Sequence, residues 1–296
     1  MTEARSSVYS GVPIVPLFGH AALRRRLAAP IAGGLLPPSL LLHGPRGIGK
    51  QRLALWIGQA LLCTGDGERP CGACQHCRYA AELGHPDLRW YFPRPRLKDA
   101  DPDADEVKDD YADAAAERAK AGGLYAPASG SDGLFVATVR AIVREAALSP
   151  ALASRKVFVV GDAERMVPQE GAEYAANAFL KLLEEPPDGT FLILTSSEPG
   201  ALLPTVRSRV VSVRVAPLGD DDVSAFMAHP AVAETLARDK GLPPDEGARL
   251  RQASGAPGAL LGGEGRAAAA QRARRPGPGC RRPLRPRRPA PLAIHP

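Results

Sequence analysis

A glycine-rich turn between an apolar run and a helical pattern constrains the fold of this chain more than any other feature. Three leucines lead through His43 into Gly44-Pro-Arg-Gly-Ile-Gly-Lys50, and a helical pattern follows to about residue 63. In such a strand–turn–helix unit, backbone N–H groups at the start of the helix surround a phosphate, and the lysine reaches the terminal phosphates. The sequence therefore predicts a phosphate loop. Its nucleotide-binding residues are Gly44, Gly47, Gly49 and Lys50.

Two parts that nucleotide hydrolysis normally requires are missing. Gln51 follows Lys50, at the position where a serine or threonine hydroxyl normally holds Mg²⁺. The second metal ligand is normally an aspartate at the end of a buried strand, but the strand pattern at residues 157–160 ends in Gly161-Asp162. Because both losses affect the same ion, they favour a site that does not hydrolyse ATP, while nucleotide binding is left open. Asp162 is either a displaced catalytic carboxylate or a helix cap or loop residue.

Apolar strands alternate with helical patterns through most of the chain. Strand patterns at residues 156–160, 191–195 and 210–215 are nearly all apolar, a short apolar stretch lies at 88–92, and helical patterns cover 136–148 and 172–184. Such strands are typical of a parallel sheet with helices on both faces, so an α/β fold is predicted. From about residue 218 the pattern is helical, at 220–227, 231–238 and 245–253, which predicts a small second domain over residues 218–264.

Two segments lack a pattern that could bury a core. Residues 98–132 hold ten acidic and four basic residues with little apolar periodicity, which predicts a disordered acidic insertion. Residues 265–296 are rich in Arg, Pro, Ala and Gly and are predicted to be a disordered tail. A GC-rich gene read out of frame would yield the same composition, and this alternative stays open. The net charge of +6 includes nine tail arginines, so the first 265 residues carry −3 and do not predict a basic nucleic-acid-binding surface.

Four of the five cysteines form the pattern Cys-x7-Cys-x2-Cys-x2-Cys. Two overlapping Cys-x2-Cys steps let thiolates converge on one tetrahedral ion, and a cysteine at the end of the preceding helix supplies the fourth ligand. A closed four-thiolate site has no open position for substrate, so the predicted zinc is structural. Disulfides or unconnected free thiols are the alternatives, and a cytosolic chain disfavours stable disulfides. The predicted zinc ligands, in a module over residues 63–77, are Cys63, Cys71, Cys74 and Cys77.

The composition indicates a globular, cytoplasmic protein. Hydrophobic residues make up 45% of the chain, and no run approaches the ~18 apolar residues of a membrane span. The first nine residues include Glu3 and Arg5 and lack the apolar centre of a secretory signal.

Several segments together resemble the clamp-loader branch of the AAA+ ATPases. They are Asn177-Ala-Phe-Leu-Lys-Leu-Leu-Glu-Glu-Pro-Pro187, residues 191–199, and Leu203-Pro-Thr-Val-Arg-Ser-Arg209. A four-cysteine module after the phosphate-loop helix is shared by the bacterial subunits of this branch, and the degenerate nucleotide site is similar to that of their delta-prime family. The resemblance covers about residues 12–262 apart from 98–132. It implies an AAA+-like P-loop domain over residues 12–217, followed by a helical lid domain.

The resemblance also implies roles for single residues. Arg209 falls on the arginine of a Ser-Arg-Cys motif, with Val210 in place of the cysteine, and would act as an arginine finger in trans on the ATP of a neighbouring motor subunit. The alternative for Arg209 is a surface ion pair. Gly258 lies where active relatives carry a nucleotide-sensing arginine, which is a third loss at the site. Family members continue into a helical collar domain, which is expected to be missing here.

The predicted function is therefore a non-hydrolysing subunit of the replicative clamp loader, itself without ATPase or polymerase activity. Its expected partners are the motor (gamma/tau) and delta subunits of DNA polymerase III and, through the complex, the sliding clamp and primer-template DNA. One alternative is an autonomous P-loop ATPase in which Asp162 or Glu164 replaces the lost metal ligand. The other is a zinc-dependent DNA-binding module, although only Arg69 and His76 are potential cations within residues 63–77.

Overall fold

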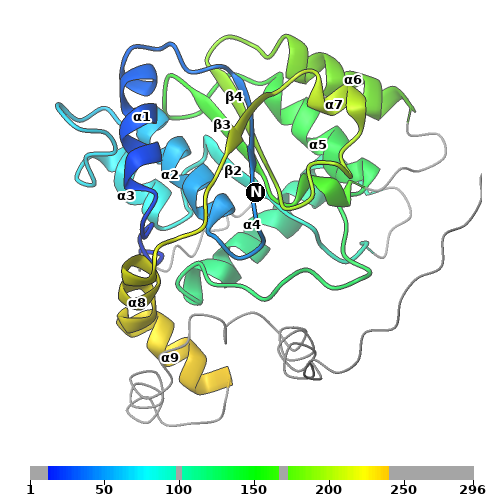
Figure 1. Cartoon of the computed structure of the whole chain (residues 1–296). Coiled ribbons are helices and arrows are strands. Elements are labelled where there is room, and N and C mark those ends of the chain that lie inside the picture. The colour runs from blue at the N-terminus through cyan, green and yellow to red at the C-terminus, as the bar shows by residue number, and fades with distance from the viewer. Residues whose placement is uncertain (1–12, 98–101, 167–172, 240–296) are drawn as a thin grey trace, which may run out of the picture. The chain divides into compact units, whose positions relative to one another are not determined.

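The computed structural model describes residues 13–97, 102–166 and 173–239 (Figure 1). The predicted tail, the predicted helix at 245–253, Gly258 and the part of the helical domain beyond residue 239 lie outside the described residues. Within the described residues, no helix is both long enough and apolar enough to cross a membrane.

Five parallel strands form a single sheet. They are β1 (Ser39–His43), β2 (Leu88–Tyr91), β3 (Lys156–Val160), β4 (Thr190–Ser196) and β5 (Val211–Arg214). Their order across the sheet is β2-β3-β4-β1-β5, and every neighbouring pair is parallel. The inner strands are almost entirely buried, whereas β5 is an exposed edge strand. The predicted parallel sheet is confirmed, and its strands lie within one residue of the predicted ranges.

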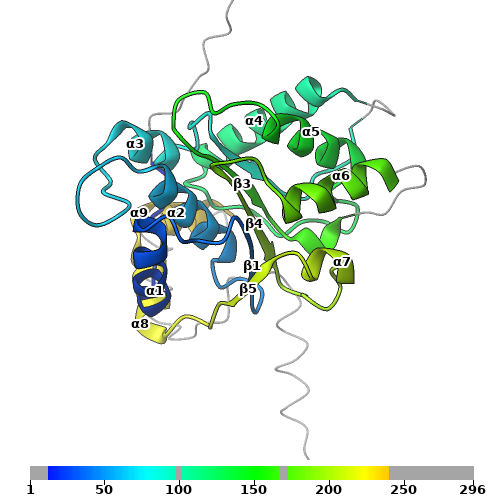
Figure 2. The same ribbon diagram turned by 90° about the horizontal axis from the view of Figure 1, so that it is seen from above.

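Helices cover both faces of this sheet, as the view from above shows (Figure 2). One face carries α1 (Ala21–Ala32), α2 (Lys50–Leu62) and α3 (Gln75–Ala81), and α2 packs directly on β3 and β4. The other face carries α4 (Ala104–Lys120), α5 (Val136–Ala146) and α6 (Glu173–Glu184), packed side by side. Three helices follow near the C-terminal end of the described chain: α7 (Pro204–Arg207), α8 (Asp220–Ala228) and α9 (Pro230–Asp239).

The prediction of a disordered insertion over residues 98–132 is wrong for its central part, because α4 occupies Ala104–Lys120. Asp103 caps this helix by accepting the N–H groups of Asp105 and Glu106, each at 2.8 Å. Acidic residues in the first turn and basic residues in the last turn complement the helix dipole. Its apolar side chains are buried against α5 and β2; they are Val107, Tyr111, Ala114 and Ala119. Most of the charges belong to the other face of an amphipathic helix, although Arg118 packs inward against aromatic rings.

The carboxyl ends of three adjacent strands bring the predicted nucleotide residues together. The phosphate loop follows β1, Gly161 and Asp162 follow β3, and Ser197 follows β4. His43 pairs with Ser196, and Val160 pairs with Leu194, so these three strands end at the same edge of the sheet. In open α/β sheets this edge is where ligands bind.

Candidate functional site

The phosphate loop has the backbone conformation that its glycines predict, but its lysine is turned back onto the chain. Gly49 precedes α2 with a φ of 85°, a conformation that other residues rarely adopt. The Lys50 ammonium donates to the carbonyl oxygens of Gly44 at 3.0 Å and Pro45 at 2.8 Å, and to Ser197 Oγ at 2.9 Å. All three N–H donors of the lysine therefore have an acceptor within the protein.

Burial lowers the pKa of Lys50, while Asp162 and Glu164 oppose this shift by favouring its charged form. His20 lies over the same loop, with Nε2 2.8 Å from the carbonyl oxygen of Ile48. The Lys50 ammonium and three carbonyl oxygens of the loop, those of Gly44, Pro45 and Ile48, thus have partners within the protein.

Gln51 and Gly161, the two residues at the expected positions of magnesium ligands, lie against each other. A Cβ atom placed on Gly161 would lie 2.4 Å from Gln51 Oε1 and 2.5 Å from Gln51 Cδ. The Gln51 side chain is buried, and its Oε1 accepts the indole N–H of Trp90 at 2.9 Å. The Gln51 amide therefore occupies the space that a side chain at position 161 would need.

Asp162 and Glu164 remain near the site but are engaged within the chain. Asp162 has a φ of 47° and precedes the short 3-10 turn Ala163–Arg165, although its side chain does not cap that turn. Burial and the neighbouring Glu164 carboxylate raise the pKa of Asp162. Glu164 Oε1 accepts the backbone N–H of Ser197 at 2.9 Å. The structure thus brings the phosphate loop, Gln51, Gly161 and Asp162 to one site, as the sequence predicts.

Arg209 lies apart from that site, between α7 and β5. Its Nη1 donates to the carbonyl oxygen of Thr205 at 3.0 Å, and its Nε lies 3.2 Å from Glu184 Oε2. The Nε–H is not directed at Glu184, so this contact is an electrostatic attraction and not a hydrogen bond. The arginine side chain is 26% exposed, and both sequence interpretations, a finger and an ion-pair partner, are compatible with its position.

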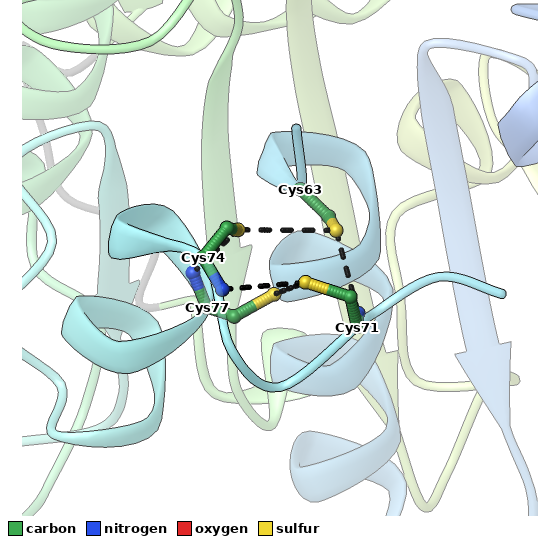
Figure 3. Close-up of side chains that lie close together, drawn as sticks. All are labelled: Cys63, Cys71, Cys74 and Cys77. Atoms are coloured by element: carbon green, nitrogen blue, oxygen red, sulfur yellow. Dashed lines mark hydrogen bonds between the residues drawn. The ribbon is translucent and has the colours of Figure 1, made fainter. Parts of the chain in front are cut away.

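The four predicted cysteines converge on one point, where their side chains face one another (Figure 3). All four Sγ atoms lie within 4.8 Å of one another, with Cys71 and Cys77 3.9 Å apart and Cys63 and Cys74 4.0 Å apart. A tetrahedral ion with Zn–S bonds of ~2.3 Å holds its sulfurs about 3.8 Å apart, so the cluster fits such an ion. All four cysteines are free, so no disulfide joins them in this structure.

Backbone N–H groups point at these sulfurs and favour thiolate. Cys71 N lies 3.4 Å from Cys63 Sγ, Cys74 N lies 3.3 Å from Cys71 Sγ, and Cys77 N lies 3.5 Å from Cys74 Sγ. Burial opposes ionisation of Cys74, but N–H groups and neighbouring thiols lower its pKa to about 5. Burial raises the pKa of Cys77. A metal ion bound in this cluster would have to displace the proton of Cys77, whose ionisation burial opposes.

A chain of hydrogen bonds connects the cysteine module to the sheet. His76 Nδ1 lies 2.9 Å from His85 Nε2, and the Asp87 backbone N–H donates to His85 Nδ1 at 3.0 Å. The Asp87 carboxylate then accepts three successive N–H groups, those of Ala151, Leu152 and Ala153, at 2.6 to 2.8 Å. The sequence patterns did not single out His85 or Asp87. A histidine and an aspartate shortly after a four-cysteine motif were the available signal.

The comparisons with known proteins agree with one another. A family model described as "DNA polymerase III, delta subunit" matches residues 19–219. The relatives include the DNA polymerase III subunit delta' of Pseudomonas aeruginosa, 34% identical over 176 residues, which are 58% of this chain and 40% of that protein. Those of Escherichia coli and Bacillus subtilis are 28% and 24% identical, over 80% and 69% of this chain and 57% and 49% of theirs.

The chain thus spans about half the length of these curated relatives. The family model, in contrast, covers more than half of this chain, including the phosphate loop, the cysteine cluster and Arg209. The chain therefore belongs to the DNA polymerase III delta subunit family and, within it, to the delta-prime subunits.

Proposed function

We propose that this chain is a subunit of the replicative clamp loader that hydrolyses no ATP and assists hydrolysis in a neighbouring subunit. Family membership supports the assignment to the loader. The observation that carries the non-hydrolysing role is the contact between Gln51 and Gly161, which fills the place of the magnesium ligands. The partners would be the motor (gamma/tau) and delta subunits and, through the complex, the sliding clamp and primed DNA.

The contacts of Lys50 and Glu164 support the same role. Lys50 donates to three acceptors of its own chain, and a nucleotide would have to replace them. Glu164, one of the two carboxylates that an autonomous ATPase could use, accepts a backbone N–H from Ser197. Lys50 and Glu164 are therefore both committed to local structure.

Arg209 would act in trans on the ATP of the adjacent motor subunit. It follows α7 on a surface where Leu203 and Val211 are each half exposed. A guanidinium cannot be deprotonated at neutral pH, so it would stabilise negative charge on the transferred phosphoryl group. An arginine finger of this kind accelerates phosphoryl transfer by roughly 10³- to 10⁵-fold.

The four-cysteine cluster would hold one structural zinc ion. Cys63, Cys71, Cys74 and Cys77 supply four sulfur ligands and leave no position for substrate. The ion would join the end of α2 to the start of α3, and the module would take no part in phosphoryl transfer.

The test uses purified full-length chain, alone and reconstituted with the motor and delta subunits. The chain alone should show no ATPase activity. Arg209→Ala should lower hydrolysis in the adjacent ATP site by roughly 10³-fold, so the DNA-stimulated rate of the complex should fall by that site's share. Arg207→Ala, which removes an exposed arginine two residues away, is the matched control. Unchanged ATPase activity in the assembled Arg209→Ala complex would rule out the finger role.

A further inference from the structure

Arg209 is held on two sides by its own chain. Nη1 donates to Thr205 at 3.0 Å and lies 3.4 Å from Ser208 Oγ, while Nε lies 3.2 Å from Glu184 Oε2. No interaction with the described residues involves the third guanidinium nitrogen, Nη2. The guanidinium therefore has two restrained nitrogens and one that still offers two N–H donors.

The carboxylate of Glu184 lies at a position where a nearby positive charge stabilises it. Glu184 is the last residue of α6, and Glu185 follows it, so two carboxylates lie at the negative end of the helix dipole. The Pro186-Pro187 pair ends the helix there and holds Glu184 beside α7. Figure 1 shows the ends of α6 and α7 close to each other. An arginine beside this position is attracted without any directed hydrogen bond.

We propose that Glu184 is a positioning residue for Arg209: its carboxylate holds the guanidinium against α7 and leaves Nη2 to contact the phosphoryl group in the neighbouring subunit. This inference rests on the proposed finger role of Arg209. A long arginine side chain samples many rotamers, and a group that is already oriented loses less freedom when the transition state forms. The carboxylate lies beside Nε, so it restrains the side chain without covering Nη2.

The test compares two substitutions that remove the same charge from adjacent residues. Glu184→Gln removes the attraction to Arg209, whereas Glu185→Gln removes a carboxylate that takes part in no ion pair among the described residues. In the reconstituted loader, Glu184→Gln should lower the DNA-stimulated kcat of the adjacent site by about 5- to 10-fold, with the KM for ATP unchanged. Glu185→Gln should stay within about 2-fold of the unsubstituted complex.

Two further variants separate positioning from a general structural effect. Glu184→Asp keeps the charge on a shorter side chain and should recover part of the lost kcat. The double variant Glu184→Gln with Arg209→Ala should be no slower than Arg209→Ala alone, because both changes act through one group. Loader assembly, measured by its mass in solution, should be the same for all five variants, Arg209→Ala included.

The outcomes also distinguish this inference from the function on which it rests. If Arg209→Ala has no effect, the proposed finger role fails. If Arg209→Ala slows hydrolysis but Glu184→Gln does not, only the positioning role is overturned. A faster rate in Glu184→Gln would overturn it as well, because the carboxylate would then be withholding the arginine from its neighbour.

Discussion

At the scale of single residues, Gln51 and Gly161, which stand at the expected positions of magnesium ligands, form one coupled feature. The sequence shows Gln51 and Gly161 as separate departures from a working nucleotide site. The structure shows that the Gln51 amide, held by Trp90, lies where a side chain at position 161 would be. No local pattern could predict this contact, because it joins residues far apart in the chain that meet only when the sheet forms. Restoring a side chain at position 161 alone would therefore create a clash with Gln51.

Gly161→Ala should destabilise the protein by about 1–2 kcal/mol, because the new methyl group displaces a buried amide that has a hydrogen-bond partner. The same substitution should cost little in a Gln51→Ala background, where the space is open. Urea denaturation of the two single variants and the double variant gives the coupling free energy. Gly200→Ala is the control, since a Cβ there meets no atom within 4 Å. If Gly161→Ala lowered the unfolding free energy equally in both backgrounds, the proposed contact between Gln51 and position 161 would be contradicted.

Asp87 is a second residue whose contribution can be measured. Burial opposes its ionisation, but three backbone N–H groups outweigh burial and hold its pKa below the usual value. Asp87→Asn should cost about 2–3 kcal/mol at pH 7, because charged acceptors form the stronger hydrogen bonds. A lowered folded pKa contributes stability above the unfolded value of about 3.9, and this contribution is lost as the pH falls through the folded pKa. The difference in unfolding free energy between Asp87→Asn and the unsubstituted protein, measured by urea denaturation, should therefore be constant from pH 5 to 8. It should become smaller below about pH 4. A difference that grew on acidification would contradict this.

At the scale of elements, strands were easier to predict than helices. The three inner strands, β1, β3 and β4, are short, mainly apolar runs that are buried on both faces, so few polar residues interrupt the pattern. Helix α1 went unpredicted because three consecutive arginines and Pro30 interrupt its apolar face. Helix α4 was assigned to disorder because its charges outnumber its apolar residues. Its spacing of Val107, Tyr111 and Ala114 was nevertheless a helical signal.

Arg118 connects α4 to the sheet through contacts with three aromatic rings. The guanidinium carbon of Arg118 lies 3.2 Å from the ring centre of Phe92, 3.9 Å from that of Tyr125 and 4.5 Å from that of Trp90. Arg118→Met keeps much of the volume but removes the cation–π attraction, and should cost about 1–2 kcal/mol of unfolding free energy. It should also reduce hydrogen-exchange protection over Ala104–Lys120.

Lys120→Met is the matched control for Arg118→Met. Lys120 is exposed, and among the described residues its ion-pair partner is exposed Glu117 at 3.1 Å, so its loss should change the unfolding free energy by less than about 0.5 kcal/mol. If residues 104–120 exchange as fast as an unfolded peptide in the unsubstituted protein, the ordered helix itself is refuted.

At the scale of the whole described chain, hydrogen bonds connect the cysteine module to the sheet and to the helix that covers it. Gln59 of α2 donates to the carbonyl oxygen of Cys77 at 2.8 Å, and the His76–His85–Asp87 chain reaches the segment that precedes β3. The cysteine spacing predicted the four sulfur positions, since metal geometry constrains spacing strongly. It could not predict this second connection, because His85 and Asp87 lie outside the motif.

Removal of the metal should therefore weaken more than the module itself. The purified protein should contain one zinc ion per chain. Chelation or Cys74→Ser should lower the Tm by roughly 10 °C, because the four converging thiols would then lose their shared ion. Hydrogen exchange should become faster at the amides of Ala151, Leu152 and Ala153, whose N–H groups donate to the Asp87 carboxylate. The increase should be smaller in β4, which lies outside this chain of hydrogen bonds. Cys280→Ser removes a cysteine outside the cluster and should leave metal content and Tm unchanged. If the metal-free protein kept its Tm and its exchange pattern, the cluster would have no structural role, and the four cysteines would need a different explanation.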